Sequence, residues 1–349
     1  MTVLIKNNVD SFLEEAANRV EETLVLQTFS SCFEWANHQI RVVLVGVSDT
    51  DFFTDAIVHR LAADISTSPE LTIYVVDDSV AEKVLPEPFW KENDLDIYGH
   101  LQGITEDDFA EYSSFNQVFT ILSRKMGLCV VWVRNVASLP EWERSFPFRN
   151  VLYQWFKNSK YLFVHAGAVG NPHGGVLLTG KGGMGKSTAT LSCLDSALKY
   201  AGDDFVMIDT ETLTVHCLYN VAKLEASNLH RFPELAPHVA NMQSLPQEKG
   251  QVFLHFCKPE SLIAQFSLKA IFLPRFTGQE TTVLRPATRG EALLALAPST
   301  IGLLKADAQM MSRIAGLIQK LPCYWIETGT LLDTIPATIS TWLNIDSNG

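Results

Sequence analysis

The chain has 349 residues, of which 47% are hydrophobic and 19% are charged, and its formal net charge at pH 7 is −12. This length usually gives more than one domain, and this composition is typical of a globular protein with a sizeable core. A nucleic-acid partner is disfavoured, because phosphate backbones are held by dense clusters of Lys and Arg that are not seen here. A membrane protein is also disfavoured, since no apolar run approaches the roughly 20 residues that span a bilayer.

The N-terminus and the cysteines predict a cytoplasmic protein. The first eight residues hold one Lys and an apolar run of three, which is unlike a secretory signal. The six cysteines form no C-x-x-C pair, and several lie in apolar stretches. We therefore expect buried free thiols rather than disulfides or zinc ligands.

The first part of the chain is predicted to form an α/β domain of its own. Residues 10–22 are amphipathic and predict a helix. A second helix is expected after Ser48, with Phe53, Ile57 and Leu61 on one face. The expected strands are residues 40–47, 71–76 and 128–133.

A boundary between two domains is expected near residue 150. Residues 138–147 contain two prolines and predict a linker or loop. The expected domains are therefore residues 1–150 and 151–349.

The second part mixes strands and helices. In chain order we expect a helix with Leu152, Trp155 and Phe156, strands at 161–164, 205–208, 268–273 and 323–326, and helices at 289–297, 306–321 and 336–343. Along the second of those three helices, Met310, Ile314, Leu317 and Leu321 form a stripe. Such a stripe predicts contact with the core rather than a binding surface.

Residues 175–188, with the sequence GVLLTGKGGMGKST, predict a phosphate-binding loop between a strand and a helix. Glycines let a triphosphate lie against backbone N–H groups, where side chains would hold it off. Lys186 would reach the β- and γ-phosphates, and Ser187 would hold Mg²⁺. The expected nucleotide-binding residues are Gly180, Lys181, Gly182, Gly183, Met184, Gly185, Lys186, Ser187 and Thr188.

Two adjacent carboxylates, Asp203 and Asp204, follow the helix of this loop. A kinase needs one carboxylate for Mg²⁺ and uses another to accept the proton of a hydroxyl. An ordinary acidic turn remains the alternative, because Gly-Asp-Asp is common in turns. Asp209 is a rival for the metal carboxylate, since it also ends an apolar strand, and Glu211 lies just beyond it.

Two further residues could contact a transferred phosphoryl group. His165 ends the strand expected at 161–164, where a structural role is the alternative. Arg275 follows the strand expected at 268–273 and opens a turn. A guanidinium there could clamp a phosphoryl group, or it could be an ordinary surface charge.

Four segments of the second part carry a family resemblance. They are Val164-His-Ala-Gly-Ala-Val169, the loop at 180–188, Gly202-Asp-Asp-Phe205 and Leu273-Pro-Arg-Phe-Thr-Gly278. Together they resemble the catalytic domain of the HPr kinase/phosphorylase family. The spacings from His165 to Gly180 and from Lys186 to Asp203 match that family. The chain is most similar to the HPr-kinase-like proteins of bacterial biosynthetic clusters, some of which phosphorylate a serine of a lasso-peptide precursor, and the resemblance runs from about residue 152 onward.

The resemblance implies an α/β fold whose mixed-sheet P-loop kinase core is similar to that of HPr kinase and phosphoenolpyruvate carboxykinase. It implies that Asp203 is the catalytic base, that His165 lies beside the transferred phosphate, and that Arg275 touches the phosphoryl group. The implied ligands of ATP and Mg²⁺ are Lys186, Ser187 and Asp204.

One segment departs from the family pattern. True HPr kinases have a Glu-Ile-Arg-Gly string after the Asp pair, whereas residues 215–225 contain no comparable string. A third metal carboxylate therefore stays open, with Glu211 or Glu225 as candidates, and so does phosphorolysis of phosphoserine. Lys223, near Arg231, either faces an anionic substrate or is a solvated surface residue.

These observations predict an ATP- and Mg²⁺-dependent kinase that phosphorylates a hydroxyl of a peptide, a protein serine or a small metabolite. The domain of residues 1–150 would recognise that acceptor. Two alternatives are kept: a switch ATPase with the deviant Walker loop of the ParA/MinD type, and a nucleotide-sensing scaffold with a kinase-like fold. The acceptor, the phosphate donor and the oligomeric state, including a homo-oligomer, stay open.

Overall fold

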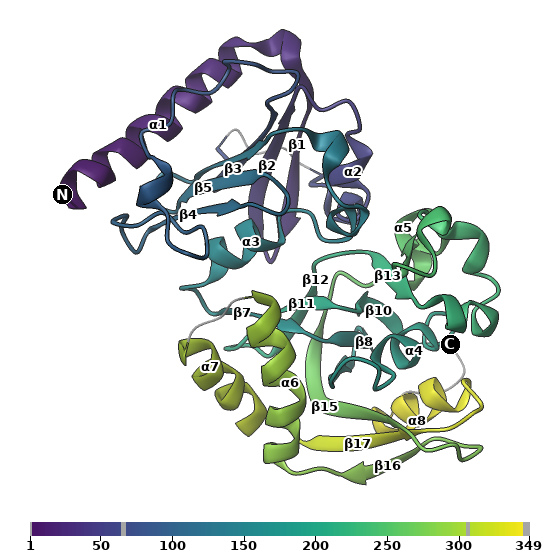
Figure 1. Cartoon of the computed structure of the whole chain (residues 1–349). Helices are drawn as coiled ribbons and strands as arrows, with labels where there is room; N and C mark the ends of the chain where they lie inside the picture. The colour runs from purple at the N-terminus through teal and green to yellow at the C-terminus, as the bar shows by residue number, and fades with distance from the viewer. Residues whose placement is uncertain (1, 64–67, 305–307, 345–349) are drawn as a thin grey trace. The chain divides into compact units, whose positions relative to one another are not determined.

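The chain forms two compact units, Met1–Trp155 and Phe156–Gly349. The computed structural model describes residues 2–63, 68–304 and 308–344 (Figure 1). The division between the units falls near the end of helix α3 (Arg149–Phe156), a few residues beyond the boundary expected near residue 150. Each unit contains a mixed sheet, so the protein is a mixed α/β protein.

The first unit is built on a six-stranded sheet. Its strands are β1 (Gln27–Trp35), β2 (His38–Val45), β3 (Leu71–Asp77), β4 (Asp108–Ser113), β5 (Val118–Ser123) and β6 (Leu128–Val133), in the order β1-β2-β3-β6-β5-β4. The central β2, β3 and β6 are parallel, and their outer neighbours are antiparallel. The three expected strands of this part are confirmed as β2, β3 and β6. The outer strands β1, β4 and β5 are additional, and β1 and β4 mix polar with apolar residues, which weakens their sequence signal.

Helix α1 (Thr2–Glu22) packs its apolar side on this sheet. Val9, Phe12, Leu13, Ala16 and Val20 are all buried and belong to one hydrophobic cluster with residues of the sheet. Their spacing of three and four residues places them on one helical face. The helix expected at 10–22 is therefore confirmed, and it begins earlier, at Thr2.

The helix expected after Ser48 is much shorter than the sequence predicts. Helix α2 (Asp51–Thr54) has four residues, and a 3₁₀ turn at Val58–Arg60 follows it. Leu61 is 53% exposed instead of sharing a buried face. The chain has left the helical path by then, because Leu61 forms a β-bridge with Phe33 of β1.

The second unit contains a nine-stranded sheet and a separate two-stranded ribbon. The sheet strands are β7 (Tyr161–His165), β8 (Gly167–Asn171), β9 (Gly174–Leu178), β10 (Lys199–Gly202), β11 (Phe205–Asp209), β12 (Thr214–Cys217), β15 (Gln265–Phe276), β16 (Val283–Pro286) and β17 (Cys323–Thr328). The ribbon is formed by β13 (Val221–Leu224) and β14 (Gly250–Phe253). The expected strands are confirmed as β7, β11, β15 and β17.

The long strand β15 joins the two halves of the nine-stranded sheet. Its first residues pair antiparallel with β12, and its later residues run parallel to β9 and β17 (Figure 1). The carboxyl ends of β9, β15 and β17 therefore meet at one edge of the sheet. The candidate phosphate loop follows β9 at this edge.

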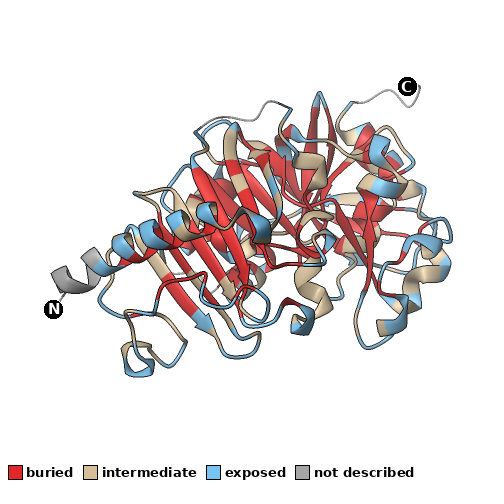
Figure 2. Cartoon of the chain, turned by 90° about the horizontal axis from the view of Figure 1, so that it is seen from above, coloured by how far each residue is buried: buried red, intermediate tan, exposed pale blue. Residues whose placement is uncertain are grey.

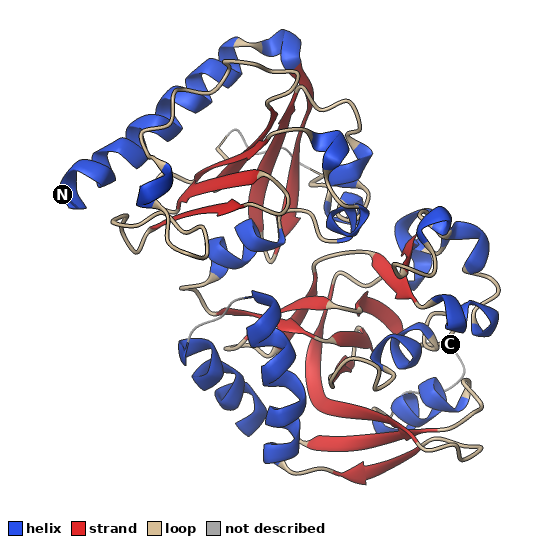
Figure 3. Ribbon diagram, in the orientation of Figure 1, coloured by secondary structure: helices blue, strands red, loops and turns tan. Residues whose placement is uncertain are grey.

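Helices pack on both sides of this sheet (Figure 3). They are α4 (Lys186–Leu191), α6 (Arg289–Leu304), α7 (Ala308–Gln319) and α8 (Thr334–Trp342), whereas the short α5 (Leu254–Cys257) directly follows the ribbon strand β14. Residues of α4 and α8 share a hydrophobic cluster with β8, β9, β15 and β17, whereas α6 contacts β7 and β15. The expected stripe is buried, which confirms its place in the core, although its last residue lies just beyond the end of α7: Met310, Ile314, Leu317 and Leu321. The first residues of the helix expected at 306–321 lie outside the described residues.

Burial follows the sheets (Figure 2). All six cysteines are free, five are buried, and Cys257 is half-buried, as the sequence predicts. Within the part of the chain that the structure describes, we find no helix with the length and hydrophobicity needed to cross a bilayer.

Candidate functional site

The candidate phosphate loop lies between β9 and α4. The amide of Thr179 donates to the carbonyl of Phe272 at 2.9 Å, which holds the start of the loop against β15. Gly183 and Gly185 have φ values of +80° and +95°, which other residues rarely adopt. A Cβ atom added at Gly182 or at either of these two glycines would have nothing within 4 Å. The loop is therefore an open cradle whose backbone can approach a ligand closely.

The side chain of Lys186 bridges the two ends of this loop. It is buried, and its Nζ donates to the carbonyl oxygen of Gly180 at 2.8 Å. Burial lowers the pKa of Lys186, and the nearby charges of Asp204 and Asp203 oppose that shift. The charge of the loop lysine is thus coupled to both carboxylates. The other predicted loop residues differ in exposure: Lys181 is exposed, whereas Met184, Ser187 and Thr188 are half-buried.

Asp203 is a buried carboxylate beside the loop. It lies between β10 and β11 and is only 1% exposed. Its Oδ2 accepts the backbone N–H of Lys223 at 3.3 Å, and its buried Oδ1 has no hydrogen-bond partner of good geometry within the described chain. Burial, and next the charge of Asp204, raise its pKa to about 7, while Ser187 on α4 acts in the opposite direction. A carboxylate with this pKa can take up a proton near neutral pH.

Asp204 is held by His165. The Nε2 of His165 lies 3.3 Å from Oδ1 of Asp204, and the backbone carbonyl of Asp204 accepts the N–H of Ala166 at 3.0 Å. This contact follows from the sheet register, in which His165 on β7 pairs with Phe205 on β11. Burial would raise the pKa of Asp204, but the hydrogen bond from His165 and nearby positive charges outweigh it and lower the pKa. Asp204 is therefore ionised where Asp203 holds its proton.

Two lysines of the ribbon region, Lys223 and Lys249, are affected by the charges of this pair of carboxylates. Lys223 on β13 is only 7% exposed, so the interpretation as a solvated surface residue is wrong. Burial lowers its pKa, and the charges of Asp204, Glu248 and Asp203 partly restore it. Lys249, just before β14, also interacts with both carboxylates. The sequence analysis did not identify Lys249, and no motif in its surroundings could have marked it.

Arg275 belongs to a different group of side chains at the same edge of the sheet. Its guanidinium pairs with Glu327 of β17 and lies 4.8 Å from the centre of the Trp325 ring. Glu327 also accepts a hydrogen bond from Arg285 at 2.8 Å, and these two arginines lower the pKa of Glu327. The structure therefore brings Lys186, Asp203, Asp204 and His165 together, and it places Arg275 with Glu327.

Asp209 does not belong to the candidate site. It ends β11, four residues beyond Phe205, which is about 13 Å along a strand. Its Oδ2 pairs with Lys160 at 2.8 Å, and its Oδ1 accepts the backbone N–H groups of Glu211 and Thr212 at 2.9 and 3.1 Å. Asp209 thus stabilises a turn, and Glu211 lies in that turn rather than beside Asp204.

Replacing Asp209 with Ala should therefore affect stability and not ligand binding. The change leaves two backbone N–H groups without their acceptor, so we expect the free energy of unfolding to fall by about 1–3 kcal/mol. Urea unfolding measures this loss, and nucleotide titration of the same variant should give the wild-type affinity. A variant of normal stability that no longer binds nucleotide would return Asp209 to the site.

The residues present fit a nucleotide with one metal ion. Across the described ranges there is no group of three or more His, Cys, Asp or Glu side chains that could hold a metal by itself. Mg²⁺ commonly binds one or two protein ligands plus phosphates and water. Ser187 and Asp204 are suitable ligands of this kind, and Glu225 is instead paired with Lys249 at 3.2 Å.

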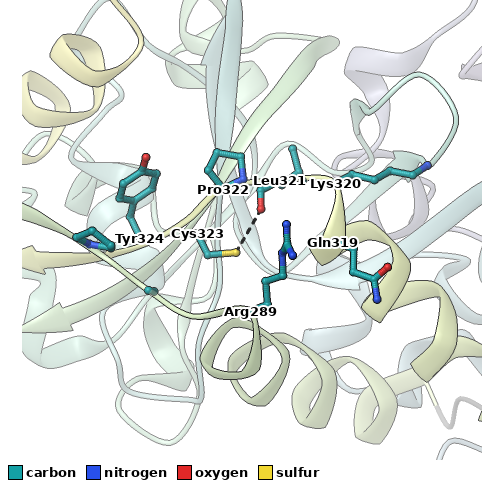
Figure 4. Close-up of a pocket in the computed structure, with 9 residues that line it drawn as sticks. Arg289, Gln319, Lys320, Leu321, Pro322, Cys323 and Tyr324 are labelled. Carbon is teal, nitrogen blue, oxygen red and sulfur yellow. Dashed lines mark hydrogen bonds between the residues drawn. The ribbon is translucent and has the colours of Figure 1, made fainter.

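A cavity of about 430 Å³ lies elsewhere in the second unit (Figure 4). Its lining includes Arg289, Lys320, Cys323 and Tyr324, and the thiol of Cys323 donates to the carbonyl of Leu321 at 3.7 Å. None of these residues belongs to the phosphate loop or the Asp pair. The candidate site is therefore defined by its charged groups and open loop rather than by this cavity.

The comparisons with known proteins leave the activity to be argued from the site. No protein-family model and no curated protein matches the chain. Among solved structures, the chain is similar to the HPr(Ser) kinase/phosphatase from Coxiella burnetii, at 11% sequence identity and a TM-score of 0.29. That match covers 52% of this chain and 95% of the other chain. A TM-score this low carries no argument about activity.

Proposed function

We propose that this protein is an ATP- and Mg²⁺-dependent kinase that transfers the γ-phosphoryl group to a hydroxyl of a peptide, a protein serine or a small metabolite. One observation carries the proposal. A glycine loop with free space at its glycines, bridged by the hydrogen bond of Lys186 to Gly180, adjoins two carboxylates whose pKa values are shifted in opposite directions. Such a division separates a proton acceptor from a permanently charged ligand.

Each side chain then has a separate task. The loop and Lys186 bind the phosphates, and Ser187 with Asp204 would hold Mg²⁺, which supplies positive charge to the phosphates when bound. Asp203 orients the acceptor hydroxyl and takes its proton as the oxygen forms a bond to phosphorus and the bond to the leaving ADP oxygen breaks. His165 keeps Asp204 ionised and in place through its 3.3 Å contact.

The first unit is proposed to bind the acceptor. It has its own sheet and its own hydrophobic cluster, so it can present a binding surface without contributing to the phosphate loop. A screen of peptides, proteins and hydroxyl metabolites with γ-labelled ATP tests the function. Label on an acceptor supports a kinase, whereas release of phosphate alone, across the whole screen, favours a switch ATPase.

Arg275 is proposed to clamp the transferring phosphoryl group after exchanging its contact with Glu327. Arg275→Lys keeps the charge but loses the planar fork, so we expect the transfer rate to fall about tenfold or more while ATP affinity changes little. Single-turnover rates and nucleotide titration measure the two effects. Arg285→Lys is the matched control, because Arg285 shares Glu327 and is 68% exposed. Equal rates in the two variants would make Arg275 a surface residue.

A further inference from the structure

One face of the β13–β14 ribbon is apolar; the other, here called the polar face, carries Lys223 and Gln251 next to the buried Val221 and Phe253. In its antiparallel register Ala222 pairs with Val252, and Lys223 pairs with Gln251. Ala222, Val252 and also Leu224 belong to a hydrophobic cluster with residues of α4 and the segment that follows it. Because side chains alternate along a strand, Lys223 lies on the opposite face of the ribbon.

The next position along that polar face carries a second lysine. Beyond the last paired residues, Glu225 and Lys249 form a 3.2 Å ion pair across the ribbon. Both side chains of this pair are about half exposed. The strand register thus places Lys249 diagonally across the ribbon from Lys223, with its side chain half exposed.

The ribbon is fixed to the candidate site by two hydrogen bonds. The hydroxyl of Tyr200 on β10 donates to the carbonyl of Val221 at 2.5 Å. The backbone N–H of Lys223 donates to Oδ2 of Asp203 at 3.3 Å. The backbone of Lys223 is thus tied to the carboxylate that is proposed to accept the acceptor proton, and the charges of Asp204 and Asp203 partly restore the pKa that burial of Lys223 lowers.

A lysine is rarely buried this deeply unless its charge is paired with an anion. The charges of Asp203 and Asp204 act on both Lys186 of the phosphate loop and Lys223 of the ribbon. The group that must lie between the loop and Asp203 during the reaction is the γ-phosphoryl group. Its charge would meet a cation on each side.

We propose that Lys223, assisted by Lys249, binds the γ-phosphoryl group, so that the polar face of the ribbon is a second phosphate subsite opposite the glycine loop. This inference rests on the proposed kinase function. It assigns the preference for ATP over ADP to the ribbon, because the loop and Lys186 also bind the phosphates of ADP.

The test compares two nucleotides rather than two rates. The affinities of Mg²⁺·ADP and of Mg²⁺ with a β,γ-imido analogue of ATP are measured by calorimetry on the full chain. We expect the wild type to favour the ATP analogue. Lys223→Met should reduce that preference about tenfold or more, because a charge-assisted contact is lost, while ADP affinity stays within about threefold. Lys223→Arg should retain part of the preference.

A matched control is Lys160→Met. Lys160 pairs with Asp209 at the end of β11 remote from the Asp pair, so this variant should keep the wild-type preference. If Lys223→Met unfolds, Lys249→Met replaces it, since the Lys249 side chain is 48% exposed and its loss should spare the fold. It should lower the preference several-fold. A wild-type preference in the folded Lys223 variant, or in Lys249→Met when that variant replaces it, overturns the inference. Failure of the wild type to bind either nucleotide would instead overturn the proposed function.

Discussion

Replacing Lys186 with Ala is expected to lower nucleotide-dependent turnover by about 10²- to 10³-fold, the usual effect of removing one preorganised charge donor. Its Nζ lies 2.8 Å from the Gly180 carbonyl and interacts with both carboxylates of the Asp pair. The substitution therefore removes both a phosphate ligand and the contact that closes the loop. Turnover and ATP affinity should fall together, and stopped-flow nucleotide binding with steady-state assays measures both.

The neighbouring Lys181 provides the control for this prediction. Lys181 is exposed in the same loop, so a kinase should tolerate Lys181→Ala with nearly wild-type turnover. A switch ATPase of the deviant Walker type needs that second lysine across a nucleotide-dependent dimer. Equal losses in the two variants, together with ATP-dependent dimerisation in light scattering, would favour the switch. Normal turnover of a folded Lys186→Ala variant would show that the glycine loop is not a phosphate-binding loop.

The glycine loop could be read from the sequence because its chemistry is local. The spacing of Gly180, Gly185 and Lys186 follows from the backbone path around a phosphate, and one window of residues contains it. The Asp pair could also be predicted from the sequence, since it lies at a strand boundary. Its contact with His165 depends on the register of β7 and β11, which no local pattern shows, and the family resemblance implied only that His165 lies beside the transferred phosphate.

Lys249 could not be found in this way, and for Lys223 the sequence left an anionic substrate and a solvated surface as alternatives. Lys223 and Lys249 are brought together by the pairing of two short strands, and the intervening segment folds into 3₁₀ turns. Only tertiary structure shows that Lys223 is buried. The predicted length of the helix after Ser48 was wrong for a related reason, because the bridge of Leu61 to β1 overrides the helical pattern. Long-range strand pairing thus decided the features that local patterns missed.

Asp203→Asn should separate proton transfer from nucleotide binding. Asn keeps the shape and the hydrogen bond from Lys223 but cannot accept a proton, so phosphotransfer should fall by about 10² or more. The affinity for Mg²⁺·ATP should hold. Asp204→Asn should instead raise the Mg²⁺ concentration needed for half-maximal rate, because it removes a metal ligand. A wild-type rate in Asp203→Asn together with a loss in Asp209→Asn would show that the wrong carboxylate was chosen.

Asp203→Asn should also change the stability of the fold by an amount that depends on pH. Burial raises the pKa of Asp203 from 3.8 to about 7 in the folded protein, so folding favours its protonated form. Its contribution to stability is complete below pH 3.8 and is lost as the pH rises to about 7. Asn does not titrate. Relative to wild type, Asp203→Asn should therefore gain free energy of unfolding as the pH rises from 5 to 8.

Asp204→Asn should change stability in the opposite sense. The pKa of Asp204 is lowered in the folded protein despite its burial, chiefly by the hydrogen bond from His165, so its charge contributes stability above its ordinary pKa of 3.8. Removing that charge should destabilise the fold at pH 8 and matter less as the pH falls below 4. Urea unfolding of both variants at several pH values measures the two slopes. Parallel slopes would mean that the two carboxylates do not divide the roles of proton acceptor and charged ligand, and the proposed mechanism would lose its base.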